Sequence, residues 1–474
     1  MHIAIIGAGF CGAMLTVHLV RKAQRPLKIA LIEKSNNIPK GVAYSTHDPS
    51  HLLNVRAINM GAFPEDKKHF YKWLLENESV WRKLDPTFET LHVELESFLP
   101  RKIYGAYLES LFQEALRGAS HKEIQIERYQ DEAVNINLNN PQQLEIELLS
   151  GNKILADTAA LTIGVPSNKA LLQNNAAAMA SDYVPNIWSK ESPNILNSSS
   201  SLAHLSPEAK IIIVGSGLTM LDAHTTLRNL NYPGQIIVVS KDSHLPKSHS
   251  EHKVLYPTFI DPNAPPKTAL TLLKCIRQEI SKASREGIDW RGVIDALRPI
   301  TISVWNQLPT KEKGKVMRWL SSVWNCHRHR VPSAYIKNFM SDIKNNRVIM
   351  ISGRAHSVEH SPDKKAILRY RPKGAHHLES LEAKYILNCS GPELNIAKNN
   401  SPLLRNLLKN GIIIPDPLNL GIDATLTGEV KGRAFGRLFA AGLILFGQQF
   451  ETIAVPELRC QSAQIAHHLL AVIS

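Results

Sequence analysis

The feature that most constrains this 474-residue chain is a glycine-rich turn placed between two apolar runs. The run His2–Ile6 leads into Gly7–Gly12 (GAGFCG), a segment with helical spacing of apolar residues follows, and Lys28–Ile32 is mostly apolar again. Strand, turn, helix and strand in this order are typical of a dinucleotide-binding βαβ unit. The context therefore favours a parallel α/β fold over an ordinary turn that carries a surface acid.

The three glycines of this turn, and the acid after the second strand, each have a place in dinucleotide binding. Gly7 permits a tight turn, Gly9 lets the backbone approach a pyrophosphate, and Gly12 lets the helix pack closely on the strand. Glu33 ends the second strand, where its carboxylate can accept hydrogen bonds from the adenosine ribose. By analogy with flavoproteins that bind two dinucleotides, the N-terminal position predicts FAD here. The further candidate FAD contacts are Phe10, Cys11, Lys34, Val134, Gly164, Gly442 and Glu451.

A second glycine-rich turn begins at Gly215 and lies between two further predicted strands. Met220 replaces the third glycine, so the helix after this turn must pack less closely or shift. Ser240 and Lys241 stand where Glu33 stands in the first unit; a hydroxyl and a cation favour a 2′-phosphate and hence NADPH, although Asp242 argues against that preference. The alternative is a degenerate βαβ unit that only supports the fold. The candidate NAD(P) contacts are Gly215, Gly217, Leu218, Ser240 and Lys241.

Two such units predict an α/β protein with two Rossmann-like dinucleotide-binding domains, together with a mainly helical insertion at about 246–340. Two dinucleotide sites make hydride transfer from a nicotinamide to a flavin the economical function, because the cofactors carry the chemistry. We expect a small-molecule substrate or electron acceptor as the partner. The sequence does not predict an oligomeric state.

Part of the net charge of +13 lies in the helical insertion, which holds four tryptophans beside many cations. Its basic stretch, Lys311–Arg330, interleaves aromatic and cationic side chains, as RNA-binding surfaces also do. We favour core tryptophans beside a solvated face; contacts to an anionic cofactor or to nucleic acid are the alternatives. FAD and NADPH are anionic and give a basic chain partners without nucleic acid.

Several other classes of protein do not fit the sequence. Its longest apolar runs are far shorter than a membrane span, and its N-terminus lacks the features of a signal peptide, so we expect a cytoplasmic protein with no membrane partner. Five scattered cysteines without metal-ligand spacing predict a reduced protein and no metal site. His244, His249 and His252 form a cluster that fits no metal template. We expect Cys11 to be a small buried residue rather than a reactive thiol.

Blocks of residues along nearly the whole chain resemble a bacterial family of FAD/NAD(P)-binding oxidoreductases. That family is similar, more distantly, to class B flavoprotein monooxygenases and N-hydroxylating monooxygenases. The blocks are Gly41–Ser45, His51–Val55, Met60–Ala62, Phe70–Leu74, Pro100–Gly105, Gly215–Asp222, Leu245–His249, Trp324–Arg330, Asn388–Pro392 and Glu451–Arg459.

The resemblance implies three-layer ββα domains, with the NAD(P) domain inserted between two parts of the FAD domain. We accordingly predict FAD-domain parts at 1–205 and 346–474 and an NAD(P) domain at 206–345. The resemblance also implies that Asn54 and Arg56 lie near the flavin, where they could stabilise negative charge. As ordinary loop residues they would need no such role. His249 is a candidate for acid/base chemistry or substrate contact, and His329 is a further catalytic candidate.

The predicted function is an FAD-dependent, NAD(P)H-oxidising oxidoreductase, in one form a monooxygenase of a small N- or S-containing substrate. One departure counts against monooxygenation: the His-xxx-Trp/Tyr fingerprint of related monooxygenases is missing, since no histidine occurs between Gly164 and Ala203. Leu443 stands where disulfide reductases of similar fold carry an acid after Gly442. The alternatives are a reductase of a quinone or protein acceptor, and a non-catalytic FAD-holding module that senses redox state or binds RNA.

Overall fold

The computed structural model describes residues 1–140, 143–164, 168–169, 171, 182–188, 196, 202, 205–251, 254–360 and 365–471. The chain forms two compact units, the first from Met1–Ser167 and Leu394–Ser474 and the second from Asn168–Glu393. The predicted boundaries, 205/206 and 345/346, both lie inside the second unit. They lie there because β8 (Tyr183–Val184) and the strands after residue 345 pair in its sheet.

The first unit is built on a five-stranded parallel sheet in the order β15-β7-β1-β2-β3. Alternation along the strands decides which face each side chain covers: Ile3 and Ile5 of β1 join one core cluster, and Ala4 and Ile6 join the other. Both faces are therefore apolar, as a sheet with two covered faces requires. The strands are β1 (His2–Ile6), β2 (Leu27–Ile32), β3 (Ile124–Tyr129), β7 (Thr158–Leu161) and β15 (Leu438–Ala440).

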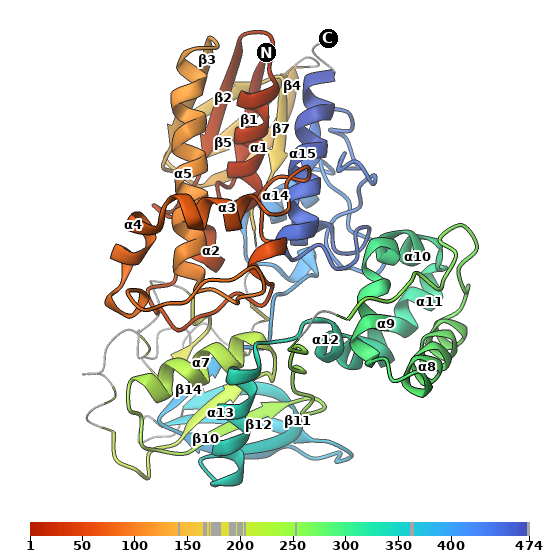
Figure 1. Cartoon of the computed structure of the whole chain (residues 1–474). Helices are drawn as coiled ribbons and strands as arrows, with labels where there is room; N and C mark the ends of the chain where they lie inside the picture. The colour runs from red at the N-terminus through yellow and green to blue at the C-terminus, as the bar shows by residue number, and fades with distance from the viewer. Residues whose placement is uncertain are drawn as a thin grey trace. The chain divides into compact units, whose positions relative to one another are not determined.

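Helices cover one face of this sheet, and a three-stranded antiparallel sheet with one helix covers the other, which gives the predicted three-layer ββα arrangement (Figure 1). The first layer holds α1 (Phe10–Lys22), α5 (Arg101–Ser120) and α15 (Val455–Ala471). The third layer holds β4 (Ala133–Asn140), β5 (Gln143–Leu148), β6 (Lys153–Ala156) and α14 (Pro402–Lys409). Three short helices lie between β2 and α5: α2 (Gly41–Tyr44), α3 (His69–Glu76) and α4 (Glu78–Trp81).

The second unit has a seven-stranded sheet in the order β13-β12-β11-β10-β9-β14-β8. Its parallel part contains β9 (Ile211–Val214), β10 (Ile236–Ser240), β14 (Tyr385–Asn388) and β8, and β11 (Val348–His360) joins it beside β10. β12 (Ala366–Pro372) and β13 (Glu379–Ala383) extend it in antiparallel fashion. α7 (Leu218–Asn229) and α13 (Ser333–Lys344) pack together on one face (Figure 1).

The predicted insertion is helical, as Figure 1 shows, and its first helix begins at residue 269. Its small core joins Ile260 of the preceding segment to Leu297, Ile300 and Val304. The helices are α8 (Ala269–Arg285), α9 (Trp290–Ala296), α10 (Thr301–Gln307), α11 (Thr310–Lys315) and α12 (Ser321–Arg328).

The last helix of the chain, α15, begins at Val455, after a segment in which Glu451 interrupts helical geometry. Glu451 has a φ of +72°, a left-handed conformation that is incompatible with a continuing right-handed helix. Pro456 lies at the second position of α15, where its missing N–H removes no helical hydrogen bond.

Candidate functional site

The first glycine-rich turn is packed so tightly that two of its glycines leave no room for a side chain. Gly7 has a φ of +97°, and a Cβ on it would lie 2.4 Å from the Thr162 carbonyl oxygen. A Cβ on Gly12 would lie 1.9 Å from the Gly7 carbonyl oxygen. The Thr162 hydroxyl fixes this geometry by donating to the Gly7 carbonyl at 2.6 Å. The turn thus joins β1, α1 and the end of β7 at one point.

Gly9 faces the backbone of α2 rather than β7. A Cβ on Gly41, which has a φ of +56°, would lie 3.1 Å from the Gly9 Cα. A Cβ on Gly105 of α5 would lie 2.5 Å from the Tyr44 carbonyl oxygen, so α2 is held between α5 and the turn. The close packing explains why small residues occur at Gly41 and Gly105.

Glu33 lies at the end of β2 and reaches the glycine-rich turn with its side chain. Its Oε2 accepts a hydrogen bond from the Ala8 backbone N–H at 2.9 Å, and its Oε1 accepts from the Ser35 backbone N–H at 3.0 Å. The carboxylate is therefore oriented beside the turn, where the sequence places the ribose contact. The position of Glu33 fits that role.

A cavity of about 330 Å³ opens beside Gly7 and Glu33. Its lining includes residues at the ends of β1, β2 and β7, together with Asp131, Glu132 and the first residue of β4, Ala133. Asn399–Leu404, the segment that leads into α14, forms another part of the lining. Lys34 lines the cavity too, with its Nζ 3.6 Å from the Glu132 carboxylate. The sequence predicts Val134 as a contact, but Ala133 is the residue that lines the cavity, and the Val134 carbonyl accepts from Asn406.

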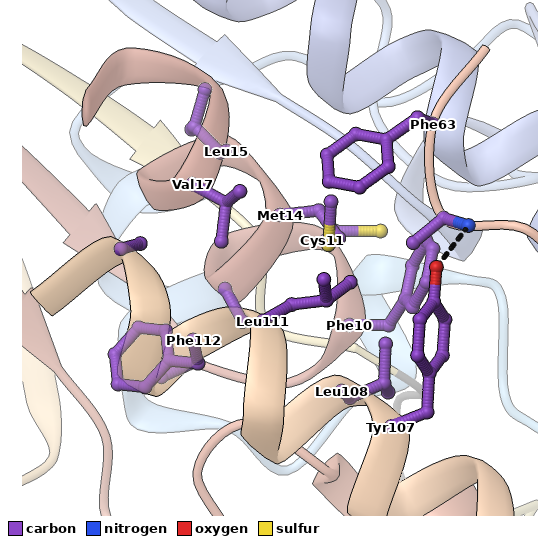
Figure 2. Close-up of a cluster of buried hydrophobic side chains, with 14 of the residues drawn as sticks. Phe10, Cys11, Met14, Leu15, Val17, Phe63, Tyr107, Leu108, Leu111 and Phe112 are labelled. Atoms are coloured by element: carbon purple, nitrogen blue, oxygen red, sulfur yellow. Dashed lines mark hydrogen bonds between the residues drawn. The ribbon is translucent and has the colours of Figure 1, made fainter. Parts of the chain in front are cut away.

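Cys11 lies within the glycine-rich turn, at the start of α1, and belongs to the apolar cluster around α1 and α5 (Figure 2). Burial raises the pKa of its thiol to about 12, so the sulfur stays protonated at neutral pH. The same cluster contains Tyr107, whose hydroxyl accepts the Ala62 backbone N–H at 3.1 Å (dashed line in Figure 2). These contacts are those of a small packed residue, and the reactive-thiol alternative has no support in them.

The structure brings the start of α1 together with Gly442, which the sequence predicts near the flavin. A Cβ on Gly442 would lie 3.6 Å from Cys11 Sγ. The Gly442 backbone N–H donates to Gln461 Oε1 at 2.8 Å, and Gln461 in turn donates to Gln449 Oε1 at 2.6 Å. Sequence reasoning missed this buried amide pair, because single glutamines, one before α15 and one within it, carry no motif. Glu451 is buried two residues after Gln449.

Arg56, Asn54 and Gly164 are the predicted flavin contacts in loops of the first unit. The Arg56 guanidinium contacts the Glu96 carboxylate at 2.6 Å and lies over the Phe98 ring. Its charge is therefore largely compensated within the protein. Asn54 is half-buried in the same segment, and Gly164 has a φ of +73° and open space where a Cβ would lie. Roles for these residues near a flavin stay predictions.

The second turn repeats the geometry of the first with one difference. Gly215 has a φ of +107°, and a Cβ on it would lie 2.3 Å from the Cys389 carbonyl oxygen. At Gly217, by contrast, a Cβ would have no described heavy atom within 4 Å, so the start of α7, at Leu218, is open. Met220, at the position of the third glycine, is fully buried in the core of this unit.

The end of β10 carries more positive charge than sequence reasoning recognised. Asp242 accepts from the Lys373 ammonium at 3.1 Å and lies 3.7 Å from that of Lys241. Burial opposes ionisation, but the hydrogen bond from Lys373 and the charge of Lys241 lower the pKa of Asp242 overall. Ser240 accepts the Ser243 backbone N–H. Lys373 follows β12, so only the β11–β12 pairing brings it here.

His249 and His329 lie on two segments that run side by side in the second unit. The His249 backbone N–H donates to the Val331 carbonyl at 2.9 Å. Burial, together with the charges of Arg328 and Arg298, lowers the pKa of His329 to about 3. His329 is therefore neutral near pH 7. A catalytic role for His249 or His329 stays a prediction.

The basic stretch is partly structural. Trp305 is buried, and Lys313 lies over its ring at 5.3 Å. Glu312 accepts from Lys315 at 2.6 Å and from the Ala269 backbone N–H at 2.9 Å. Trp319 is an exception, because 67% of it is exposed. The favoured interpretation of core tryptophans beside a solvated face thus holds for Trp305 and not for Trp319.

Within the described residues, no group of three or more His, Cys, Asp or Glu side chains is arranged to hold a metal ion. His252, the third member of the histidine cluster, lies outside the described residues. No described helix combines the length and the apolar character that crossing a membrane requires. All five cysteines are free.

Comparison with known proteins agrees with the geometry of the first turn. Residues 4–166, which contain the turn, Glu33 and β7, match a family model described as FAD-NAD(P)-binding. This segment is an FAD/NAD(P)-binding domain. No curated protein matches the chain.

The fold of the whole chain is shared with solved N-hydroxylating and related monooxygenases. The ornithine N-hydroxylase of Kutzneria sp. 744 has a TM-score of 0.62 at 12% identity, with 100% of this chain and 99% of that chain covered. The L-lysine 6-monooxygenase of Pseudomonas syringae has a TM-score of 0.64 at 13% identity, again with 100% and 99% covered. The ornithine hydroxylase of Pseudomonas aeruginosa has a TM-score of 0.62 at 12% identity, with the same coverage.

These likenesses confirm the predicted fold class, in which an FAD/NAD(P)-binding domain is accompanied by a second domain of dinucleotide-binding type. At such identities the comparison concerns the fold. The residues that would bind each cofactor are argued from their own geometry.

Proposed function

We propose that this chain is an FAD-dependent, NAD(P)H-oxidising oxidoreductase, with FAD in the first unit and NADPH in the second. The observation that carries the proposal is the presence of two glycine-rich turns with left-handed glycines, each between a buried strand and the start of a helix. Helix N-termini of this kind favour phosphate groups. FAD would supply two-electron redox chemistry when bound.

The charges of the first cavity favour FAD over a 2′-phosphorylated dinucleotide. Glu33, Asp131 and Glu132 all line the cavity, whereas Lys34 is its one lining cation among the described residues. Three carboxylates would repel a 2′-phosphate but can accept hydrogen bonds from a free ribose. The Glu33 carboxylate, held by Ala8 and Ser35, is already oriented for such a bond.

The charges at the end of β10 favour NADPH in the second unit. Lys241 and Lys373 flank Asp242, so this group of three side chains carries a net positive charge. The ammonium groups can rotate from Asp242 to a 2′-phosphate, because the side chains of both lysines are more than half exposed. Asp242, which argues against NADPH in the sequence, here positions the two cations.

The fold supports a monooxygenase as the form of this oxidoreductase that we favour. The neighbours named above act on ornithine and lysine, and we propose a small substrate with a nucleophilic nitrogen or sulfur for this chain too. We further propose a cytoplasmic location, which the five free cysteines favour. A reductase of a quinone or protein acceptor is the competing function.

The visible absorption spectrum of the purified protein tests this function. We expect a flavin spectrum that bleaches when NADPH is added without oxygen and returns when oxygen is admitted. Tight coupling of NADPH oxidation to product, with little hydrogen peroxide, would favour the monooxygenase. Rapid electron transfer to a quinone would favour the reductase. A colourless protein that does not take up added FAD would overturn the proposal.

A further inference from the structure

The cavity of the first unit has a second wall that neither the motifs nor the fold comparison assigns to a ligand. This wall begins with Asn399, Asn400 and Ser401 and continues into the first turn of α14. Glu33 and the segment Asp131–Ala133 line the same cavity. The chain reaches this place only after it has completed the second unit.

Asn399 is a residue of this wall with a buried hydrogen-bond donor that lacks an acceptor among the described residues. Its Oδ1 accepts the Ser401 backbone N–H at 2.9 Å, which orders the turn before α14. Its Nδ2 is buried and has no hydrogen-bond partner among the described residues, and only 4% of the residue is exposed. A buried amide donor without an acceptor destabilises the protein, so such groups call for an explanation. A ligand that brings an acceptor into the cavity would supply the missing partner.

The other lining residues indicate which part of a dinucleotide that acceptor belongs to. Glu33 marks the ribose position, and Ile6, Ile32 and Leu403 give the cavity apolar surfaces suited to a flat ring. Three carboxylates line the same cavity and disfavour the charged pyrophosphate there. Adenine carries ring nitrogens that accept hydrogen bonds and bear no charge, so it satisfies both conditions.

We propose that Asn399 Nδ2 donates a hydrogen bond to the adenosine half of the dinucleotide bound in the first unit, which makes the Asn399–Leu404 segment part of that binding site. This inference rests on the proposed function, because it requires FAD in the first unit. It adds a contact from the returning part of the chain to the site that the N-terminal turn begins. Asn399 is a binding residue and takes no part in electron transfer.

The isosteric substitution Asn399→Asp tests the contact. Aspartate keeps an oxygen for the Ser401 N–H but replaces the donating Nδ2 by a second acceptor. We expect FAD affinity, measured by titration of flavin fluorescence into apoprotein, to fall by at least about tenfold. ADP, measured by calorimetry or by competition with FAD, should lose affinity by a similar factor.

Asn395→Asp is the matched control, since it adds the same charge four residues earlier. Asn395 Oδ1 caps a 3-10 turn by accepting the Ala397 N–H at 3.0 Å, and aspartate can do the same. We expect FAD affinity within about twofold of wild type for this variant. Thermal unfolding of each apoprotein shows whether the variants fold. If Asn399→Asp does not fold, Asn399→Ala takes its place, with the same loss of affinity expected.

The possible results separate the two proposals. A wild-type protein that binds no FAD overturns the proposed function, and the inference with it. A wild-type protein that binds FAD, with an unchanged affinity in the folded Asn399 variant, overturns the inference alone. Weaker FAD binding with unchanged ADP binding also overturns it, since the contact would then lie outside the adenosine half.

Discussion

Replacing Gly12 by alanine tests the packing of the first glycine-rich turn most directly. The added Cβ would lie 1.9 Å from the Gly7 carbonyl oxygen and 2.7 Å from Thr162 Oγ1. An ordinary carbon–oxygen contact is about 3.3 Å or longer, so α1 or the turn must move by more than about 1 Å. Because the Gly7 carbonyl accepts a hydrogen bond from the Thr162 hydroxyl, the movement would also lengthen or break that hydrogen bond.

The expected cost follows from these contacts. Overpacking of a rigid site costs up to about 3 kcal/mol, and loss of the Thr162 hydrogen bond adds about 1 kcal/mol. Alanine recovers about 1 kcal/mol through its higher helix propensity, which leaves a net destabilisation of about 3 kcal/mol for Gly12→Ala. The FAD site should weaken too, because Gly7 and Glu33 share this turn.

Urea denaturation of the apoprotein, followed by circular dichroism, measures this free energy of unfolding. Gly217→Ala is the matched control: Gly217 holds the equivalent of the Gly9 position in the second turn, has a φ of −88° and leaves room for a Cβ. We expect it to change stability by less than about 0.5 kcal/mol. A Gly12→Ala protein within about 1 kcal/mol of wild type, with normal FAD content, would refute the packing argument.

Three further predictions concern pH, coenzyme preference and thiol reactivity. Burial lowers the pKa of His18 from 6.5 to about 4, so between these pH values the unfolded chain binds a proton more readily than the folded protein does. The free energy of unfolding should therefore fall by up to about 3 kcal/mol as the pH drops from about 6.5 to about 4. In His18→Leu, the midpoint of urea unfolding should depend less steeply on pH in that range. Lys373→Ala should raise the KM for NADPH about tenfold and leave the KM for NADH unchanged in steady-state assays. Alkylation of the native protein at pH 8 should label the exposed Cys460 and leave Cys11 unmodified in mass spectrometry.

Each of these expectations has an outcome that contradicts it. An unaltered acid slope in His18→Leu would mean that the histidine is not the group that titrates. Equal changes in the KM for NADPH and NADH would exclude a specific phosphate contact by Lys373. Lys365→Ala, one residue before β12, controls for the loss of one surface charge. Labelling of Cys11 before unfolding would show that α1 opens in the native state.

Local patterns in the sequence predict the first unit's turn well, because Gly7, Gly12 and Glu33 act within one short βαβ segment. The same patterns could not predict Asn399 or Lys373. Both lie in polar loops without a motif, and only long-range strand pairing brings Lys373 to the end of β10. Local patterns also could not assign β11–β13 to the second unit. Alternation of apolar and polar residues shows which side chains share a face of a strand, but it does not show which sheet the strand joins.

The predicted chemistry of the basic stretch shows the same limit. The sequence shows that cations and tryptophans lie close together along this stretch. Only the burial of each side chain shows whether it belongs to the core or faces solvent. Glu312 forms an ion pair with Lys315, so the charge of this lysine is compensated within the protein. Trp319, by contrast, is exposed and is not part of the core. For His329, burial lowers the pKa most, and the charges of Arg328 and Arg298 lower it further. Arg298 is too far along the chain for sequence reasoning to pair with it.

The split of the first unit has a consequence for how the protein is made. On the ribosome, β7 emerges early and pairs with β1, but its other edge waits for β15, which follows the entire second unit. At ordinary rates of translation the delay is on the order of tens of seconds. During that time an apolar strand edge, Thr158–Leu161, is open to mispairing with other chains. The cavity beside Gly7 is likewise complete only when Asn399–Leu404, which follow the second unit, have been made.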